Sequence, residues 1–324
     1  MKLISIVVPV FNEQENIQVF YQEVSKTMEV LDYPFELIFI DDGSTDRTVL
    51  LLDRLTQQDP RVKAILLARN FGHQVALTCG LDHAAGEAVI TMDGDMQHPP
   101  ELLPILIRKW EEGFEVVQTV RIATEGVSRF KERSSSLFYR LINAMSDIQI
   151  VEGGSDFRLL DKKVVQTFQC FKEKARFIRG IIGDMGYRQA RVEFVAPERF
   201  AGQSKFSLKK MIDFALNGIT AYSKLPLRFA FYLGLLFGLL SFGLTLDVVY
   251  IKLFTTEAVP GWATIAASVL LLGGLQLVVM GIIGEYVGRI FEEVKQRPLY
   301  WVRGELKKSE QVFPKREQQV HAVS

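Results

Sequence analysis

The chain has 324 residues, enough for one large domain or two smaller ones, and 48% of them are hydrophobic. Its 38 Lys and Arg residues balance 38 Asp and Glu residues, so the overall charge gives no reason to expect a nucleic-acid partner. The two cysteines, Cys79 and Cys170, lie far apart without CxxC spacing, and we expect both to be reduced and structural.

Apolar runs alternate with helix-like segments in the first part of the chain. Strands are predicted at residues 3–10, 35–40, 62–67 and 88–92, and helices at residues 13–31 and 71–85. Ser44 or Thr45 is predicted to cap a further helix, with Asp46 in its first turn. Continuous apolar strands separated by helices indicate an α/β fold with a mostly parallel sheet, covered on both faces.

Polar clusters follow three of the predicted strands, at residues 11–13, 41–44 and 93–95. Ligands of such sheets bind beyond the carboxyl ends of the strands. We therefore expect the three clusters to meet at one edge of the sheet. Their convergence favours a nucleotide site over three unrelated helix caps.

Asp93 and Asp95 are separated by one small residue at the end of a buried strand. Carboxylates in this arrangement can hold Mg²⁺ or Mn²⁺, and the ion can bridge and neutralise a departing diphosphate. Acids at strand ends also cap helices, so this pattern by itself leaves both interpretations open. The neighbouring clusters at the other strand ends favour the metal and nucleotide interpretation.

Two apolar segments, residues 229–246 and 262–283, contain no charged residue. Each is long enough as a helix to cross an apolar slab of about 30 Å. Buried helices of a globular domain are the alternative, but such helices are rarely uniformly apolar for so long. We predict two transmembrane helices, at about residues 229–251 and 262–284.

Basic residues flank the predicted spans on their outer sides, and these are Lys224, Arg228, Arg289, Lys295 and Arg297. The positive-inside rule then places both flanks in the cytoplasm, so that the spans form a hairpin. The N-terminus lacks the length and cleavage site of a signal peptide. We expect a multi-pass protein of the cell inner membrane with its catalytic domain and both termini in the cytoplasm.

A basic amphipathic segment precedes the first predicted span. Apolar residues recur at helical spacing between residues 208 and 219, with Lys209 and Lys210 on another face. This pattern favours a helix at the bilayer surface over an ordinary surface helix. We assign residues 1–200 to the catalytic domain, 201–228 to this interfacial region and 285–324 to a cytoplasmic tail.

Six motifs in chain order resemble glycosyltransferase family 2, and these are VVPVFNE, DDGSTD, RNFGHQVALTCGLDHA, DGDMQHPPE, SDFRLLD and RFAGQSKF. Within that family the chain is most similar to the polyprenyl-phosphate glycosyltransferases, which include bactoprenol glucosyltransferases and dolichol-phosphate mannose synthases. The likeness runs from about residue 3 to about residue 300 and includes both predicted spans. It implies a GT-A fold.

The resemblance also implies site residues. Those implied to contact the nucleotide-sugar are Pro9, Phe11, Glu13, Asp41, Asp42, Asp93 and Gln97, and those implied to contact phosphate are Arg121, Arg199 and Lys205. Asp93 and Asp95 are the implied metal ligands. Asp156 resembles the acid often proposed as a base, but a dianionic lipid phosphate needs no strong base. We expect Asp95, Asp156 and Arg158 to be catalytic residues. Asp156 has two open roles, as a base or as a group that orients Arg158 or another cation.

The expected reaction is a single inverting displacement, in which a polyprenyl phosphate, such as undecaprenyl phosphate, attacks the anomeric carbon of a nucleotide-sugar. UDP-glucose is the first donor expected, and a homo-oligomer is possible. A processive polysaccharide synthase is one alternative, although the QxxRW motif typical of those enzymes does not fit here. A non-catalytic membrane scaffold is the other, and the intact Asp93, Asp95, Gln97 and Lys205 argue against it.

Overall fold

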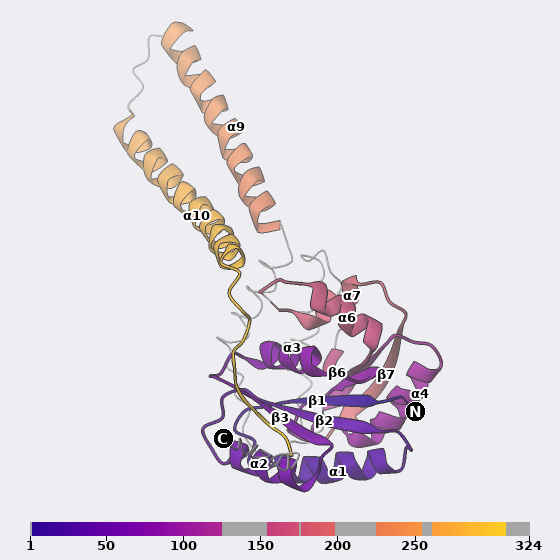
Figure 1. Ribbon diagram of the computed structural model, residues 1–324. Coiled ribbons are helices and arrows are strands. Elements are labelled where there is room, and N and C mark those ends of the chain that lie inside the picture. The colour runs from indigo at the N-terminus through magenta and orange to yellow at the C-terminus, as the bar shows by residue number, and fades with distance from the viewer. Residues whose placement is uncertain (1, 125–153, 175, 198–224, 255–260, 309–324) are drawn as a thin grey trace, which may run out of the picture.

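The centre of the fold is a sheet with the strand order β7-β5-β6-β4-β1-β2-β3-β8 (Figure 1). The computed structural model describes residues 2–124, 154–174, 176–197, 225–254 and 261–308. The strands are β1 (Ile4–Val10), β2 (Phe35–Asp41), β3 (Val62–Leu67), β4 (Ala88–Thr91), β5 (Val116–Thr124), β6 (Gly154–Asp161), β7 (Gln189–Ala196) and β8 (Val302–Leu306). The helices are α1 (Ile17–Glu29), α2 (Thr48–Gln58), α3 (His73–His83), η1 (Pro100–Leu102), α4 (Leu103–Glu111), α6 (Lys162–Cys170), α7 (Ile178–Asp184), α9 (Leu225–Phe254) and α10 (Trp262–Val294).

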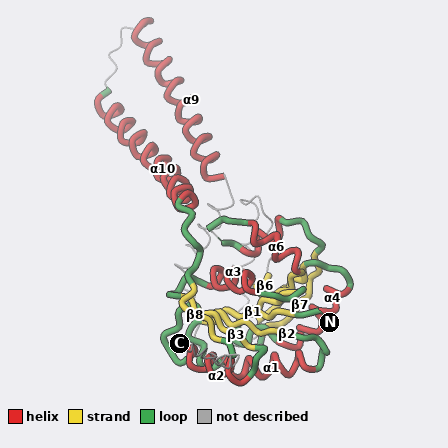
Figure 2. The backbone as a smooth tube through the Cα atoms, in the orientation of Figure 1, coloured by secondary structure: helices red, strands yellow, loops and turns green. Residues whose placement is uncertain are grey.

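Most neighbouring strands run parallel, which confirms the predicted α/β class. β1 pairs in parallel with β2 and β4, β2 with β3, and β5 with β7. The antiparallel pairs all involve β6 or β8. Helices lie on both faces of the sheet (Figure 2). The carboxyl ends of β1, β2, β3 and β4 therefore share one edge of the sheet.

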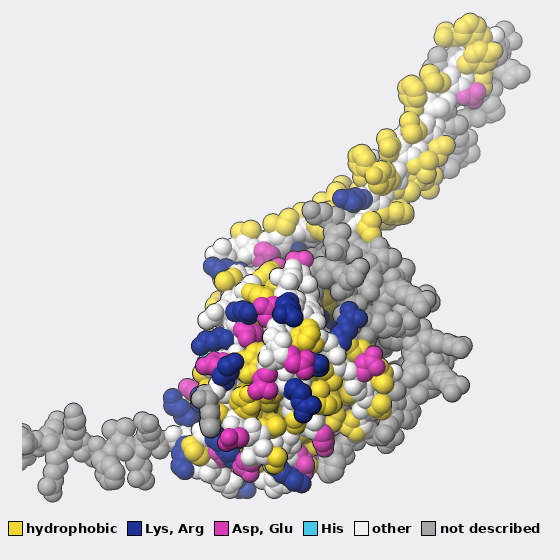
Figure 3. Space-filling view, turned by 90° about the vertical axis from the view of Figure 1, so that its right-hand side faces the viewer, with side chains coloured by type: hydrophobic (Ala, Val, Ile, Leu, Met, Phe, Trp, Pro, Cys, Tyr) yellow, Lys and Arg dark blue, Asp and Glu magenta, His cyan; other side chains and the backbone are white. Residues whose placement is uncertain are grey.

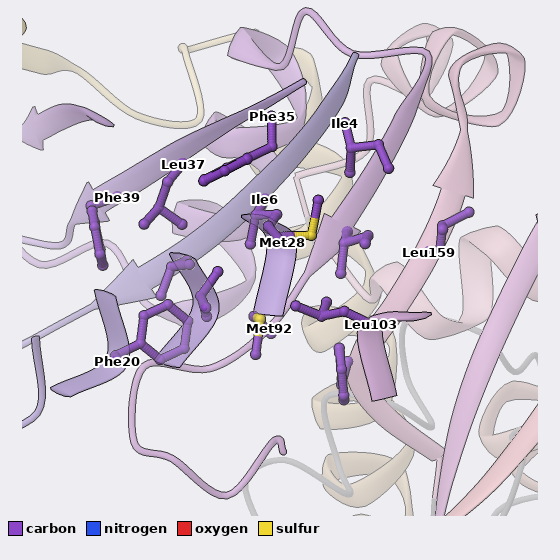
Figure 4. Close-up of a cluster of buried hydrophobic side chains, with 14 of the residues drawn as sticks. Ile4, Ile6, Phe20, Met28, Phe35, Leu37, Phe39, Met92, Leu103 and Leu159 are labelled. Carbon is purple, nitrogen blue, oxygen red and sulfur yellow. The ribbon is translucent and has the colours of Figure 1, made fainter. Parts of the chain in front are cut away.

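Alternation along the strands divides the core into two layers. Ile4, Ile6 and Val8 of β1 point to a cluster packed on α1, α2 and α4, whereas Val7 belongs to the cluster under α3, α6 and α7. Figure 4 shows the first cluster, in which Phe20 and other helix side chains meet the sheet. Burial on both faces is the physical reason why these strands are continuous apolar runs.

All four predicted strands form close to their expected bounds, but the expected cap of the helix after β2 is wrong. That helix, α2, begins at Thr48, two residues beyond Asp46, and no side chain caps it at Arg47. The Oγ atom of Ser44 instead accepts a hydrogen bond from the Asn12 backbone N–H at 2.9 Å. Ser44 thus bonds to the loop after β1 rather than to α2, whereas Asp46 Oδ1 accepts the Thr48 N–H at the start of α2 at 2.9 Å.

Two long helices, α9 with 30 residues and α10 with 33, extend away from the α/β domain (Figure 1). Apolar side chains cover much of their described surface (Figure 3). Within the described residues, one segment, Leu271–Val294, is long and apolar enough to cross a membrane, and α9 has a shorter apolar segment, Leu227–Gly243. The amphipathic helix predicted between residues 208 and 219 lies outside the described residues.

After α10 the chain returns to the sheet, and residues 298–306 are called the return segment here. Its strand β8 pairs antiparallel with β3 at the edge of the sheet. Trp301 accepts a hydrogen bond from the Ala68 N–H at 2.9 Å, and the Tyr300 hydroxyl donates to Asp82 Oδ2 at 2.9 Å. The sequence analysis did not predict this strand, which ties α10 to the α/β domain.

Candidate active site

The loops that follow β1 and β2 are joined by hydrogen bonds. Besides the Asn12–Ser44 bond, the Thr45 N–H donates to Asn12 Oδ1 at 2.8 Å, and the Glu13 N–H donates to Thr48 Oγ1 at 2.9 Å. Asn12 adopts a left-handed backbone conformation with φ of 55°, which asparagine tolerates better than most residues. Two of the three predicted polar clusters therefore meet.

The Asp93-Gly94-Asp95 loop lies directly against the end of β1. A Cβ atom on Gly94 would lie 3.1 Å from Val10 Cγ1 and 3.4 Å from Val8 Cγ1. The small residue between the two acids thus lets the loop approach β1 closely. The third polar cluster is next to the other two, as the parallel sheet led us to expect.

His98 anchors the loop that carries Asp93. Its side chain is buried, and its Nδ1 accepts the Asp93 N–H at 2.8 Å. The proton of the neutral ring is therefore on Nε2, which donates to Ser155 Oγ at 2.7 Å. Burial lowers the pKa of His98, and the ring stacks on Phe157 with 5.1 Å between centroids. His98 thus links the loop after β4 to β6.

Asp156 on β6 is surrounded by cationic and polar donors. Its Oδ1 accepts from Arg158 Nη2 at 3.0 Å and from Arg179 Nε at 2.9 Å, and its Oδ2 accepts from Gln74 Nε2 at 3.2 Å. Burial opposes the charge, but Arg179, His73 and Arg158 hold the pKa of Asp156 well below its usual range. A carboxylate with so low a pKa is a weak base, so the geometry favours the orienting role.

Arg158, one of the predicted catalytic residues, is fully enclosed, with only 1% of its surface exposed. Its Nη2 also donates to the Ser155 carbonyl at 2.8 Å. Burial lowers the pKa of Arg158 to about 10, which leaves it charged at neutral pH. Its position suits a residue that holds Asp156 in place.

His73 bridges two acids, and the sequence analysis gave it no role. Its Nε2 lies 3.4 Å from Asp93 Oδ1 and 3.4 Å from Asp156 Oδ2. Desolvation opposes its charge, but Asp93 and Asp156 raise the pKa of His73 to about 9, so the ring is protonated at neutral pH. His73 lies within the RNFGHQVALTCGLDHA motif, but it has no second histidine or acid at the spacing of metal ligands, so the sequence gave no reason to select it.

Asp42 holds the turn that leads into His73. Its Oδ1 accepts from the Phe71 N–H at 2.7 Å and its Oδ2 from the Gly72 N–H at 2.9 Å. Asp41 beside it accepts from the Ser44 N–H at 3.2 Å. Burial raises the pKa of both carboxyls. The β2 end is thereby connected through the start of α3 to Asp93 and Asp156.

A pocket opens beside these loops at the carboxyl ends of β2 and β3. Its lining residues are Asp41, Gly43, Ser44, Thr45, Val49, Leu66, Leu67, Ala68, Arg69 and Arg303. It combines a buried carboxylate, Asp41, with two exposed guanidinium groups, Arg69 and Arg303. The sequence analysis identified neither arginine. Arg303 could not be expected here, because β8 brings it to the pocket from far along the chain.

The remaining predicted residues are distributed around this edge. Pro9 is buried within β1, and Glu13 Oε2, in the loop after it, accepts from Asn16 Nδ2 at 2.6 Å. The Gln97 N–H donates to Asp95 Oδ1 at 3.1 Å. Phe11 follows β1 and is half-buried.

The predicted phosphate ligands all follow the Asp93-Gly94-Asp95 loop in the sequence. Arg121 belongs to β5, and its guanidinium carbon lies 6.0 Å from the centre of the Phe194 ring. Arg199 and Lys205 lie outside the described residues. Arg179, which contacts Asp156, is a cation near the site that the sequence analysis did not identify.

The residues present fit a divalent ion that is shared with a substrate. Within the described residues, no group of three or more His, Cys, Asp or Glu is arranged to hold a metal. Asp93 Oδ1, however, is buried there without a hydrogen-bond partner, and its ionic neighbour is the His73 ring at 3.4 Å. Mg²⁺ and similar ions are commonly held by one or two carboxylates together with substrate phosphates and water. Asp93 and Asp95 suit that kind of site.

Gly43 allows the loop after β2 to lie against the backbone of Arg69. Its φ is 75°, and a Cβ atom would lie 2.6 Å from the Arg69 carbonyl carbon. Gly43→Ala should therefore destabilise the protein beyond the roughly 1–3 kcal/mol that backbone strain alone costs. Gly186→Ala is the control, because φ is 72° there and nothing lies within 4 Å of the added atom. Equal losses of thermal stability for the two full-length variants in detergent would contradict this close contact.

Comparison with known proteins agrees with this architecture. The sequence model of the protein family described as Glycosyl transferase family 2 matches residues 5–168. The family model described as GtrB C-terminal hairpin matches residues 225–290. An uncharacterised glycosyltransferase of Bacillus subtilis is 44% identical over 92% of this chain and 93% of its own. A bactoprenol glucosyl transferase of Shigella phage SfV is 41% identical over 94% and 99% of the two chains, respectively. With a family model that matches half of the chain and relatives this similar along nearly their whole length, the chain belongs to glycosyltransferase family 2.

Proposed function

We propose that this protein transfers one sugar from a nucleotide-sugar to a polyprenyl phosphate. The observation that carries the proposal is the position of the Asp93-Gly94-Asp95 loop against the end of β1, beside the joined loops after β1 and β2. Acids that suit a diphosphate-bound ion thus lie at the same sheet edge as a pocket. Relatives named bactoprenol glucosyl transferase support the lipid acceptor.

The strand order supports an extended donor across this edge. Asp93 and Asp95 follow β4, whereas the pocket with Asp41 and Arg69 lies at β2 and β3. Adjacent strands lie about 4.8 Å apart, so the two places are separated by roughly 10–15 Å. A nucleoside diphosphate can span such a distance. We propose that the nucleoside occupies the pocket and the diphosphate lies near the two acids.

The reaction is proposed to be a single in-line displacement. An oxygen of the lipid phosphate forms a bond to the anomeric carbon, while the bond from that carbon to the diphosphate oxygen breaks and its electrons leave with the nucleoside diphosphate. An α-linked donor then gives a β-linked lipid product. When bound, Mg²⁺ or Mn²⁺ would be held by Asp93 and Asp95 and would offset the charge on the departing diphosphate.

Cationic residues have a separate task in this proposal, which is to offset the repulsion between the acceptor phosphate and the donor diphosphate. Arg121, Arg199 and Lys205 are the proposed phosphate ligands. Asp156 orients Arg179 through hydrogen bonds at 2.9 and 3.1 Å. No strong general base is required, because a phosphate monoester with a second pKa near 6 is already mostly dianionic at neutral pH.

The helices α9 and α10 are proposed to form a transmembrane hairpin, with the α/β domain and both termini on the cytoplasmic face of the inner membrane. Their exposed apolar surfaces and the match to the GtrB C-terminal hairpin support this arrangement. Since the acceptor cannot leave the bilayer, anchoring the site nearby raises the local concentration of the two reactants.

The decisive test is a transfer reaction with the purified full-length protein, undecaprenyl phosphate, Mg²⁺ or Mn²⁺, and a panel of labelled nucleotide-sugars. We expect a lipid-linked monosaccharide, with UDP-glucose as the best donor, and loss of product when the metal is chelated. A long polysaccharide product would indicate a processive synthase instead. Failure to release nucleoside diphosphate from any donor would indicate a non-catalytic scaffold.

A further inference from the structure

We infer that Arg303 binds the donor nucleotide, so that the return segment after α10 supplies part of the donor pocket. This inference rests on the proposed function. It adds a residue that lies more than 200 positions beyond the loops after β2 and β3 in the sequence.

A break in strand register aims Arg303 at the pocket. Val302 pairs with Leu67, and Gly304 pairs with Leu66, so Arg303 between them has no partner on β3. One extra residue on one strand of an antiparallel pair is a β-bulge. Bulges occur at sheet edges and next to active sites, where they redirect a side chain. Here the redirected residue lines the same pocket as Asp41 and Arg69.

The backbone on the N-terminal side of Arg303 is held firmly. The Trp301 carbonyl accepts from the Ala68 N–H at 2.9 Å, and the Trp301 ring meets Phe71 edge-on at 5.9 Å between centroids. Phe71 is in turn held by Asp42 through its backbone N–H. An arginine held on such a support loses less freedom when it binds a ligand than one on a mobile tail.

The charges in the pocket match a nucleotide. Within the described part of the chain, neither Arg69 nor Arg303 forms an ion pair, and Arg69 lies over the Phe71 ring at 4.6 Å. Two guanidinium groups donate to carbonyl or phosphate oxygens, while the Asp41 carboxylate can accept from a base N–H group. A pyrimidine nucleotide such as a uridine phosphate offers both kinds of partner.

The position along the sheet assigns Arg303 to the nucleoside end of the donor. The pocket lies two to three strands from β4, or roughly 10–15 Å from the acids that suit the diphosphate. A contact at the nucleoside end affects UDP and UMP alike. A contact with the second phosphate would weaken UDP binding and spare UMP.

The test is calorimetric titration of the full-length protein in detergent with UDP plus Mn²⁺ and, separately, with UMP. Arg303→Gln should raise the Kd of both nucleotides by about five- to tenfold, as expected for loss of a partly exposed charged hydrogen bond. Arg303→Lys should recover part of the loss. Lys307→Gln is the matched control, because Lys307 is also an exposed cation, just beyond β8, but does not line the pocket.

The outcomes separate the two hypotheses. Unchanged nucleotide binding by Arg303→Gln would overturn the role of Arg303 while leaving the proposed function in place. An equal loss in Lys307→Gln would also overturn it, because the effect would then reflect net charge alone. If the wild-type protein bound neither UDP nor UMP, both this inference and the uridine donor of the proposed function would fall.

Discussion

Replacing Asp95 with alanine is expected to reduce sugar transfer by about a thousandfold or more, because the diphosphate would lose much of the charge compensation on which its departure depends. The fold should persist. Asp95 is half-buried, and its Oδ1 accepts the Gln97 N–H, a bond worth about 1 kcal/mol. The measurement is initial-rate transfer to undecaprenyl phosphate, together with a thermal unfolding curve for each variant.

Asp53→Ala is a suitable control for this experiment, because Asp53 is an exposed acid on α2, away from the site. Its activity should match that of the wild-type protein. Metal-dependent UDP binding gives a second readout, which Asp95→Ala should lose even if a trace of transfer remains. Full activity in Asp95→Ala would remove the metal assignment from this loop.

Asp156→Asn is expected to cause the largest loss of stability, about 3–5 kcal/mol, because it leaves the buried Arg158 guanidinium without its carboxylate. Arg179 and His73 would lose the same partner. Breaking a buried ion pair from one side strands an uncompensated charge, which is why the cost is large. Chemical unfolding of the full-length protein in detergent measures the effect.

The control for this variant is Glu112→Gln, which breaks the exposed ion pair with Lys109 at 2.7 Å. Its unfolding midpoint should stay close to that of the wild-type protein, because exposed ion pairs contribute little. An Asp156→Asn midpoint equal to the wild-type value would contradict the buried cluster. The pH dependence of the wild-type rate tests whether Asp156 is a base. If Asp156 removes a proton from the acceptor phosphate, the rate should fall only in strong acid, as the lowered pKa of Asp156 is approached. If the dianionic phosphate attacks unaided, the rate should already fall near pH 6, where that phosphate takes up a proton.

The part of the site that could be predicted from the sequence is the part built by neighbouring parallel strands. Apolar runs gave the strands, and the rule that ligands bind beyond their carboxyl ends brought residues 11–13, 41–44 and 93–95 together. The small residue between the two acids was also recognisable from the sequence. The structure explains it, because Gly94 lies so close to Val10 that a larger side chain would crowd it.

Contacts between distant segments were beyond such reasoning. His73 meets Asp156 across 83 positions, and Arg179 reaches it from α7, so no local pattern marks either residue as part of the cluster. β8 is short and mixes charges with glycine, VRGEL, which is a weak strand signal. Its pairing with β3 depends on where α10 delivers the chain, and this is a property of the whole fold.

The antiparallel pairing of β8 with β3 has a consequence for how the protein matures on the ribosome. The nascent chain completes β1 to β7 before α9 and α10 emerge, and β8 comes after both helices. Until then the outer edge of β3 presents unpaired backbone groups that can associate with other chains. Closure of that edge, and with it the wall of the pocket that carries Arg303, therefore waits for translation of both long helices.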